Sequence, residues 1–232
     1  PMHSFGQPCR IAEIADLCTA HGIPLVEDAA ESLGSLVGAR HTGTFGRVGT
    51  LSFNGNKVIT TGGGGMLVTD DHGLAERARH LSTTAKRPHP WEFIHDEVGY
   101  NYRMPNLNAT LGCSQLERLD WMLEHKRTVA LRYQAFFDES GDMRWYRPVE
   151  GTRPNHWLNA VALADAAERD AFLRYSNEQG VMTRPVWRLM TQLPMFADCW
   201  NDGVPNALDA QERVVNLPSS VPASAISGGG AA

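Results

Sequence analysis

Among the residues of this chain, Lys57 has the neighbouring sequence that most strongly suggests a catalytic role. It follows an apolar run, 48–53, that predicts a buried strand, and an Asn-Gly-Asn turn presents it. Four consecutive glycines, 62–65, come next, and a second strand is expected over 66–69. A lysine held out of bulk water between apolar strands and glycines can act as an amine nucleophile toward a carbonyl group.

Two other side chains suit the same chemistry. Asp28 follows a short apolar segment, 23–26, and Ser52 stands five residues before Lys57. Pyridoxal phosphate needs an amine for its aldehyde, a carboxylate facing its pyridine nitrogen, and hydroxyl and N–H groups for its phosphate. Lys57, Asp28 and Ser52 offer one group for each need, and glycines let the backbone approach the phosphate. We therefore expect Lys57 to form a Schiff base with pyridoxal 5′-phosphate.

Each of these residues also has a structural explanation when it is taken alone. An aspartate at a strand end is often a cap or turn residue, Ser52 could bond to backbone, Lys57 could be solvated, and the glycine run could be a flexible turn. The glycine run matches neither GxxxxGK[ST] nor a post-strand GxGxxG, which gives a nucleotide phosphate loop little support. The residues favour a cofactor site only as an ordered set.

The elements that must position these residues predict an α/β fold. Apolar residues at helical spacing over 8–21, followed by Gly22, predict a helix that leads into a strand at 23–26. A helix followed by a buried strand is half of a βαβ unit, so a parallel sheet is expected. Ligands of such sheets bind at the carboxyl ends of strands, where Asp28 and Ser52 are expected to lie.

The remaining chain predicts more helix and a second, smaller lobe. A helix is expected over 71–81, capped by Asp70 or Asp71, and an irregular loop over 82–105. A long apolar stripe predicts a helix or helix pair over 106–138. After Gly141 a small α/β lobe is expected, with a strand at 156–163, a helix at 166–179, a strand at 180–183 and an unstructured tail from 219.

Composition excludes several classes of protein. The 232 residues are 42% hydrophobic, enough for a real core, and the net charge of −5 without a basic run gives nucleic-acid binding little support. The four cysteines form no CxxC pair, which argues against a zinc site or a disulfide framework and suits a reducing cytoplasm. No apolar stretch approaches the roughly 20 residues that span a bilayer. Because Pro1 stands where a methionine would begin, we expect a natural N-terminal part to be missing.

Several motifs occur in an order that resembles one known family. The segments 27–34 (EDAAESLG), 43–46 (GTFG), 52–57 (SFNGNK) and 62–66 (GGGGM) closely resemble the DegT/DnrJ/EryC1/StrS family of pyridoxal-phosphate-dependent sugar aminotransferases. The segments 98–109 and 181–185 extend the resemblance, which covers about 1–220.

The resemblance implies an aspartate-aminotransferase-like fold, fold type I, with a partial large domain and a small C-terminal α/β domain. Residues 1–138 would be the C-terminal portion of the large cofactor-binding domain, including a connecting helix at about 106–138. Residues 139–220 would be the small domain and 221–232 a flexible tail. The family's first third, with a Gly-Thr turn for the cofactor phosphate and a stacking aromatic ring, has no counterpart here.

The resemblance also implies roles for single residues. Lys57 matches the Schiff-base lysine, Asp28 the partner of the pyridine nitrogen, and Ser52 the phosphate-binding serine. Glu31 stands where the family usually has Gln or His beside the phenolic oxygen. Asn101 matches an asparagine that reaches the cofactor phosphate of the neighbouring subunit, which implies a homodimer.

By the same resemblance, Arg103 would contact the substrate, and His156 and Arg184 would line the sugar-nucleotide cleft from the small lobe. The reaction would transfer an amino group from glutamate to a nucleotide-linked 4-keto-6-deoxy sugar. The segments 84–86 and 95–97 look like the branch that makes 4-amino sugars for legionaminic-acid-type or perosamine-type surface glycans.

Two alternatives stay within this fold. One is a catalytically silent relative or incomplete fragment that acts as a binding or regulatory partner. The other is a sugar dehydratase, in whose branch histidine replaces the lysine. The presence of Lys57 argues against a silent relative and against a dehydratase.

Overall fold

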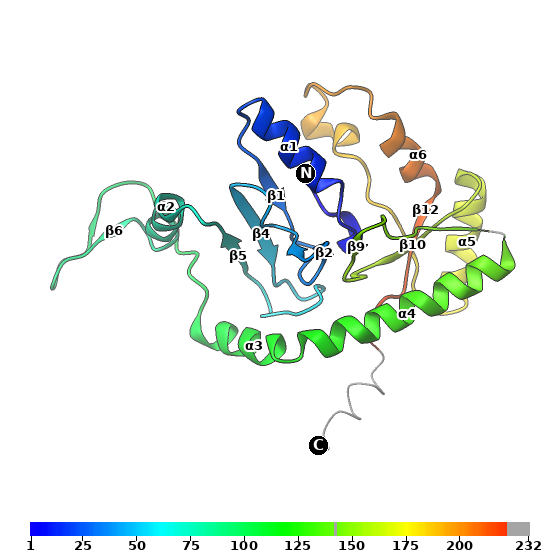
Figure 1. The fold of residues 1–232 in the computed structure, drawn as a ribbon, viewed down its shortest axis with the longest axis horizontal. Helices are drawn as coiled ribbons and strands as arrows, with labels where there is room; N and C mark the ends of the chain where they lie inside the picture. The colour runs from blue at the N-terminus through cyan, green and yellow to red at the C-terminus, as the bar shows by residue number, and fades with distance from the viewer. Residues whose placement is uncertain (142, 222–232) are drawn as a thin grey trace, which may run out of the picture. The chain divides into compact units, whose positions relative to one another are not determined.

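The computed structural model describes residues 1–141 and 143–221 (Figure 1). The chain forms two compact units, one of residues 1–124 with 148–157 and one of 125–147 with the described residues from 158 on. The division falls inside the long helix α4 (Leu119–Ser140). The functional domain ranges expected from the sequence, 1–138 and 139–220, stay a prediction.

A three-stranded sheet organises the first unit. Its order is β1 (Val26–Asp28), β4 (Val48–Ser52), β5 (Gly65–Val68), with β1 parallel to β4 and β5 antiparallel to β4. The predicted parallel pairing is therefore confirmed for β1 and β4. Helix α1 (Ile11–Ala20) precedes β1 and begins three residues later than the helix predicted over 8–21.

The strand predicted over 23–26 is displaced toward the C-terminus. β1 begins only at Val26, Ile23 is exposed, and the fully buried member of the strand is Glu27. The apolar pattern misled the prediction because a charged side chain occupies the inward position.

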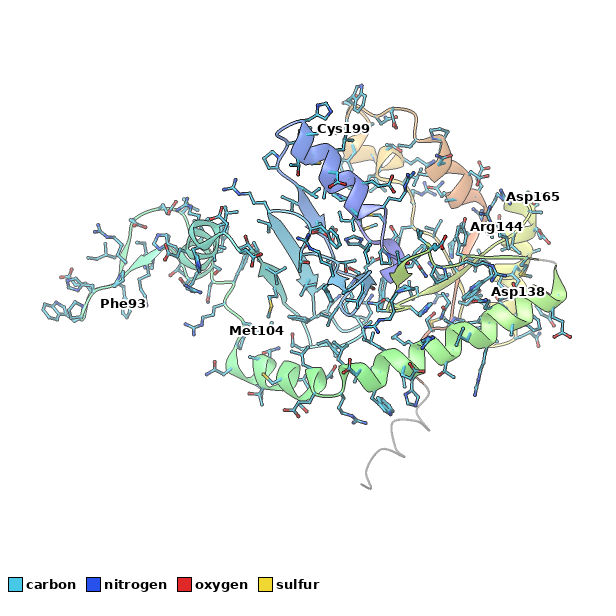
Figure 2. All side chains as sticks on the ribbon, viewed as in Figure 1. Phe93, Met104, Asp138, Arg144, Asp165 and Cys199 are labelled. Carbon is cyan, nitrogen blue, oxygen red and sulfur yellow. The ribbon has the colours of Figure 1, made fainter. Side chains whose placement is uncertain are left out.

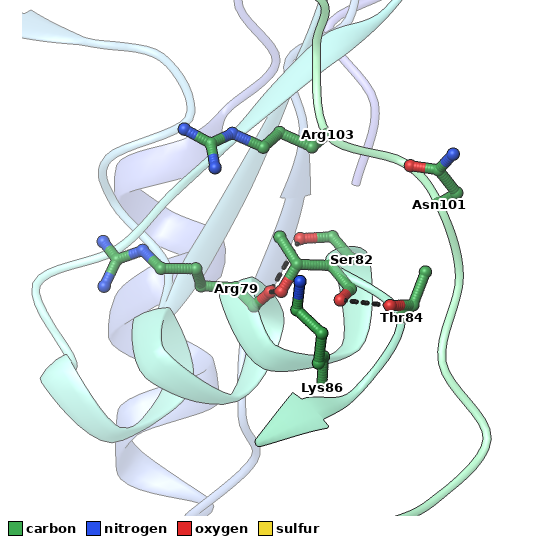
Figure 3. A pocket seen from close by; sticks show the side chains of 7 residues that line it. Arg79, Ser82, Thr84, Lys86, Asn101 and Arg103 are labelled. Atoms are coloured by element: carbon green, nitrogen blue, oxygen red, sulfur yellow. Dashed lines mark hydrogen bonds between the residues drawn. The ribbon is translucent and has the colours of Figure 1, made fainter. Parts of the chain in front are cut away.

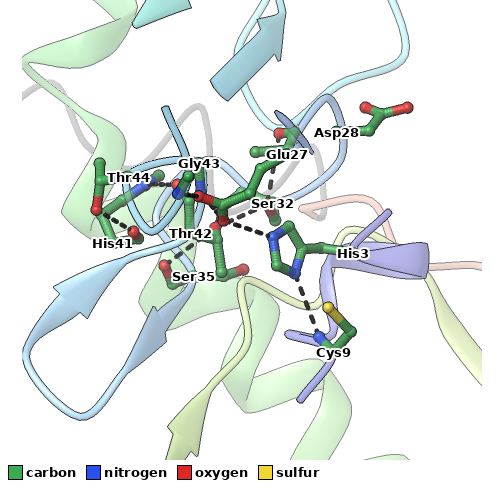
Figure 4. A network of polar contacts seen from close by, with 12 residues as sticks. His3, Cys9, Glu27, Asp28, Ser32, Ser35, His41, Thr42, Gly43 and Thr44 are labelled. Atoms are coloured by element: carbon green, nitrogen blue, oxygen red, sulfur yellow. Dashed lines mark hydrogen bonds and ion pairs between the residues drawn. The ribbon is translucent and has the colours of Figure 1, made fainter. Parts of the chain in front are cut away.

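A network of polar contacts explains how Glu27 can be buried (Figure 4). One of its carboxylate oxygens accepts hydrogen bonds from the Gly43 N–H (2.7 Å) and lies 3.1 Å from His3 Nε2, and the other accepts from the Gly46 N–H (2.6 Å). The Cys9 N–H donates to His3 Nδ1 (3.2 Å), so Nε2 is the ring nitrogen that donates its proton to Glu27. Burial opposes ionisation, but these bonds outweigh it and lower the pKa of the Glu27 carboxyl.

The first unit contains further elements around this sheet. Helix α2 (His72–Ser82) is capped by Asp71, whose carboxylate accepts from the Leu74 N–H, as predicted. The segment 82–105 is not wholly irregular, because it holds the hairpin β6 (Lys86–Arg87) and β7 (Ile94–His95). The other elements are η1 (Ser4–Gly6), the antiparallel sheet of β3 (Arg40–His41), β2 (Leu36–Val37) and β9 (Thr152–Arg153), and helix α3 (Asn106–Leu116).

The helix pair predicted over 106–138 is confirmed as α3 and α4, with a break at 117–118. Much of the apolar stripe on α3 is nevertheless exposed, with Leu107 83% and Leu111 43% accessible.

The second unit is an antiparallel sheet with helices. Its strand order is β11 (Arg184–Pro185), β12 (Val214–Leu217), β10 (Asn159–Ala162), β8 (Arg144–Trp145). Phe137 of α4, Trp145, Val161 and Val215 belong to its buried core. The remaining elements are α5 (Ala166–Glu178), η2 (Met190–Gln192), η3 (Pro194–Phe196) and α6 (Pro205–Arg213).

The sequence predicted α5 well but placed the strands of this unit less accurately. The strand expected over 156–163 is limited to 159–162, and the one expected over 180–183 forms at 184–185 instead. The expected flexible tail, 221–232, lies outside the described residues except for Val221. In the part of the chain that the structure describes, no helix combines the length and apolarity needed to cross a bilayer. All four cysteines are free thiols.

Candidate active site

The loop after β4 holds Lys57 in a sheltered position. The loop is closed by hydrogen bonds from the Lys57 N–H to Asn54 O (3.1 Å) and from the Thr61 N–H to Phe53 O (3.0 Å). The Lys57 side chain is only 14% exposed. Its Nζ lies 3.9 Å from Glu31 Oε1 and 4.1 Å from the centre of the Trp157 ring. A primary amine is thus held between a carboxylate and an aromatic face.

Trp157 is the site residue that sequence reasoning missed. Its indole Nε1–H donates to Asn56 O (2.6 Å), so the ring fixes the lysine loop as well as covering Lys57. Asn155 holds the two residues that contact Lys57. Its Oδ1 accepts from the Trp157 N–H (2.8 Å), and its Nδ2 donates to Glu31 O (2.8 Å). One hundred residues separate Trp157 from Lys57, and no local pattern in the sequence links them.

Asp28 and Ser52 both end strands at the same edge of the sheet. The parallel register pairs Asp28 with Thr50, two residues before Ser52. The Asp28 side chain is exposed, and its Oδ1 accepts a hydrogen bond from the Ala30 N–H (3.1 Å). Ser52 Oγ accepts from the Asn54 N–H (3.3 Å). Its hydroxyl proton remains available to a ligand.

The glycine run makes the turn into β5, beside Ser52. Gly62 and Gly64 have φ of +80° and +98°, and a Cβ on Gly65 would lie 2.4 Å from Leu51 O. Side chains at these positions would strain the turn or block the β4–β5 pairing.

Glu31 carries a carboxylate into the same site. Its Oε2 accepts a hydrogen bond from the Phe5 N–H (2.8 Å), and the side chain is 9% exposed. Burial raises the pKa of the Glu31 carboxyl, and the Phe5 N–H and Lys57 oppose this only partly, while nearby Asp28 adds to it. Glu31 therefore gains a proton more readily than an ordinary glutamate.

Replacing Trp157 by phenylalanine should weaken the hold on the lysine loop. An aromatic face is kept, but the bond to Asn56 O is lost and part of the buried indole volume is left empty, at a cost of about 1–3 kcal/mol in the free energy of unfolding. Urea titration followed by circular dichroism measures this loss. The matched control is Trp91→Phe, since Trp91 is 78% exposed and should tolerate the change. Equal stability of the two variants would contradict the anchoring role.

The other residues predicted from the sequence lie in different surroundings. Asn101 and Arg103 line a pocket beside the end of α2 (Figure 3). His156 is buried in the first unit next to Trp157, with a φ of +50°. Arg184 belongs to the second unit, where Nη1 donates to Asn177 Oδ1 (3.1 Å) and Thr183 O (3.0 Å). The structure thus gathers Lys57, Glu31 and Asp28 in one place and Asn101 and Arg103 in another.

The donor set around Lys57 fits pyridoxal 5′-phosphate. The cofactor needs a sheltered amine, a carboxylate free to face its pyridine nitrogen, and phosphate ligands. Lys57, the exposed Asp28 carboxylate and the Ser52 hydroxyl with the adjoining glycines meet these needs. The Glu31 carboxyl group beside this amine is compatible with a contact to the cofactor's phenolic oxygen.

Comparisons with known proteins identify the family. A model of the DegT/DnrJ/EryC1/StrS aminotransferase family matches residues 1–224. EpsN of Bacillus subtilis, whose name assigns it to the pyridoxal phosphate-dependent aminotransferases, is 39% identical over 83% of this chain and 49% of its own length. GDP-perosamine synthase of Escherichia coli O157:H7 is 34% identical over 94% of this chain and 59% of its own.

A solved structure agrees with this relationship. The aminotransferase TlmJ from Streptoalloteichus hindustanus has a TM-score of 0.90 and 32% identity, over 98% of this chain and 62% of that one. The chain thus spans about half to three fifths of the proteins that it matches. Aminotransferases of this family depend on pyridoxal 5′-phosphate. This chain belongs to the DegT/DnrJ/EryC1/StrS aminotransferase family and has the α/β fold, fold type I, of its pyridoxal-phosphate-dependent enzymes.

Proposed function

We propose that the protein transfers an amino group to a nucleotide-linked 4-keto-6-deoxy sugar, with pyridoxal 5′-phosphate as cofactor and glutamate as donor. The product would be a 4-amino sugar for a surface polysaccharide, made in the cytoplasm. The observation that carries this proposal is the sheltered Lys57 amine beside Glu31, at the sheet edge that Asp28 and Ser52 share. The perosamine synthase among the relatives, named for a GDP-linked sugar, supports the substrate class.

The side chains divide the work at this site. When bound, the cofactor supplies an electron sink that acidifies the carbon carrying the donor's amino group. Lys57 Nζ would hold the cofactor, and it would also serve as the base and acid that moves a proton at the carbon carrying the donor's amino group. The Asp28 carboxylate would keep the pyridine nitrogen protonated, and the Ser52 hydroxyl would donate to the phosphate. Trp157 keeps water away from Lys57 Nζ.

Glu31 has a separate task in this proposal. With its raised pKa it can donate a hydrogen bond to the phenolic oxygen in its protonated form or accept one from Lys57 in its ionised form. Arg103, His156 and Arg184 are proposed to contact the sugar nucleotide.

Asn101 lines a pocket whose lining residues do not include Lys57. We therefore include a homodimer in the proposal. We propose that Asn101 completes the phosphate site of the second subunit. The proposal predicts complementation between Lys57→Ala and Asn101→Ala, since a mixed dimer would keep one intact site. Co-expression should restore about a quarter of wild-type activity at limiting cofactor. No gain over the separate variants would contradict the shared site.

The experiment that tests the function itself is a transfer assay. The protein is incubated with pyridoxal 5′-phosphate, glutamate and GDP-, UDP- or dTDP-linked 4-keto-6-deoxyhexoses, and products are identified by mass spectrometry. Formation of the 4-amino sugar with any of them supports the proposal. A protein that binds the sugar nucleotides but transfers nothing would instead be the binding or regulatory relative.

A further inference from the structure

The pocket at the end of α2 is rich in cations and contains no carboxylate in its lining. It has a volume of about 650 Å³, a size typical of small-molecule sites. Figure 3 shows Arg79 and Arg103 extending in the same direction, while Lys86 points its ammonium group toward the end of α2. The lining residues are Arg79, Ser82, Thr83, Thr84, Lys86, Asn101 and Arg103. Among the described residues, no side chain pairs with the guanidinium of Arg79 or of Arg103.

The two carboxylates that precede Asn101 and Arg103 in the chain, Asp96 and Glu97, do not neutralise this pocket. Asp96 lies 2.7 Å from His80 Nε2, and Glu97 accepts two hydrogen bonds from Arg77. These contacts also fasten the end of the β6–β7 hairpin to α2. Two carboxylates near the pocket are therefore already engaged by cations of their own.

The carbonyl end of α2 is likewise satisfied, which matters because unpaired carbonyls would repel an anion. The Thr83 N–H bonds to Arg79 O (3.1 Å), the Ala85 N–H to His80 O (2.9 Å), and the Tyr100 N–H to Leu81 O (2.7 Å). The Tyr102 N–H bonds to Ser82 O (2.9 Å). The cations therefore dominate the electrostatics of the pocket.

The backbone is shaped to place Lys86 here. Thr84 and Ala85 both adopt left-handed conformations, with φ of 66° and 50°, and Ala85 is fully buried. Such conformations are disfavoured for residues with a Cβ and concentrate at functional sites. After this turn, Lys86 Nζ stands 4.9 Å from the centre of the Phe93 ring across the hairpin. Arg87, the next residue of the strand, points to the opposite face.

We propose that this pocket binds the diphosphate group of a nucleotide-linked sugar, with Arg79 and Lys86 as its ligands together with Arg103. The inference rests on the proposed function and names the residues that would recognise the substrate's diphosphate. A diphosphate ester carries two negative charges spread over several oxygens, which suits three separated cations and the hydroxyls of Ser82 and Thr84. The arginine guanidinium groups can each bind two phosphate oxygens.

Binding of phosphate compounds to the protein tests this proposal without any turnover. UDP, GDP and inorganic pyrophosphate are titrated calorimetrically at low salt into wild type, Arg79→Ala and Lys86→Ala. Each substitution should weaken nucleoside diphosphate binding by about tenfold or more, because each removes a charged hydrogen-bond donor. The matched control, Arg87→Ala, removes a neighbouring cation on the other face and should bind as wild type does. Unchanged binding in Arg79→Ala and Lys86→Ala would overturn the proposal.

Two further titrations separate the possible sources of the phosphate. Uridine and guanosine, which lack phosphate, should bind equally to all variants. Pyridoxal 5′-phosphate should also bind equally, as followed by the absorbance of the protein-bound cofactor. If the substitutions weakened only cofactor binding, the pocket would hold the cofactor's phosphate and the proposal would be wrong. If Arg79→Ala and Lys86→Ala bound nucleoside diphosphates as tightly as wild type while the cofactor still bound at Lys57, this inference would be wrong and the proposed function would stand.

Discussion

Substituting alanine for Lys57 is expected to lower kcat for amino transfer by about 10³-fold or more, because one change removes both the cofactor's anchor and the proton carrier. The amine is positioned for these tasks by its contacts with Glu31 and Trp157. Initial rates with saturating cofactor measure the effect. Added pyridoxal phosphate should not restore the rate, since the missing group belongs to the protein.

Lys57→Arg is the matched control for this change. Arginine keeps a positive charge for Glu31 and a cation for the Trp157 face, so stability should stay close to wild type. Its guanidinium is always protonated and cannot move a proton or form the Schiff base. The arginine variant should therefore be as inactive as the alanine variant. Substantial transfer by the arginine variant would show that another residue is the catalytic base.

The second large effect is expected on stability. Glu27→Ala removes the acceptor for buried His3, for the buried Gly43 N–H and for the half-buried Gly46 N–H. Leaving such groups buried without a partner should lower the free energy of unfolding by about 3–5 kcal/mol. Urea titration measures this, with the exposed Glu13→Ala as control, which should change little because Glu13 only bonds exposed Arg10. A similar small change in both variants would contradict the network.

The same network predicts a pH dependence with a definite sign. The pKa of Glu27 is lower in the folded protein than its usual value of 4.5, so the folded state favours the ionised carboxylate. This stabilisation is complete above pH 4.5 and is lost as the pH falls below 4.5 through the lower, folded pKa. In Glu27→Gln the acid limb of the stability profile should be shallower than in wild type. Parallel profiles would indicate that other carboxylates cause acid unfolding.

Sequence patterns predicted the helices and strands that are determined by residues close together in the sequence. The strand before Lys57, the Asp71-capped helix α2 and helix α5 follow their apolar spacing and caps. The helix–strand order predicted a parallel sheet, and β1 and β4 form a parallel pair. Short strands were placed less well, because β1 buries a glutamate and β11 has only two residues.

Contacts between distant segments could not be predicted. Trp157 covers Lys57 from one hundred residues away, and His3 reaches Glu27 across 24 residues. Arg79, Lys86 and Arg103 line one pocket, and the residue types of Thr84 and Ala85 do not predict the left-handed conformations that precede Lys86. A polar residue whose hydrogen-bond partner is distant in the sequence produces no periodic sequence pattern. The site consists mostly of such residues.

Reductive labelling tests the central claim, that Lys57 carries the cofactor, most directly. The protein loaded with pyridoxal 5′-phosphate is treated with borohydride, digested and mapped by mass spectrometry. The structure predicts a pyridoxyl group on Lys57 and an unlabelled peptide in Lys57→Arg. A stoichiometric label on any other lysine would contradict the assignment of Lys57, and with it the proposed mechanism.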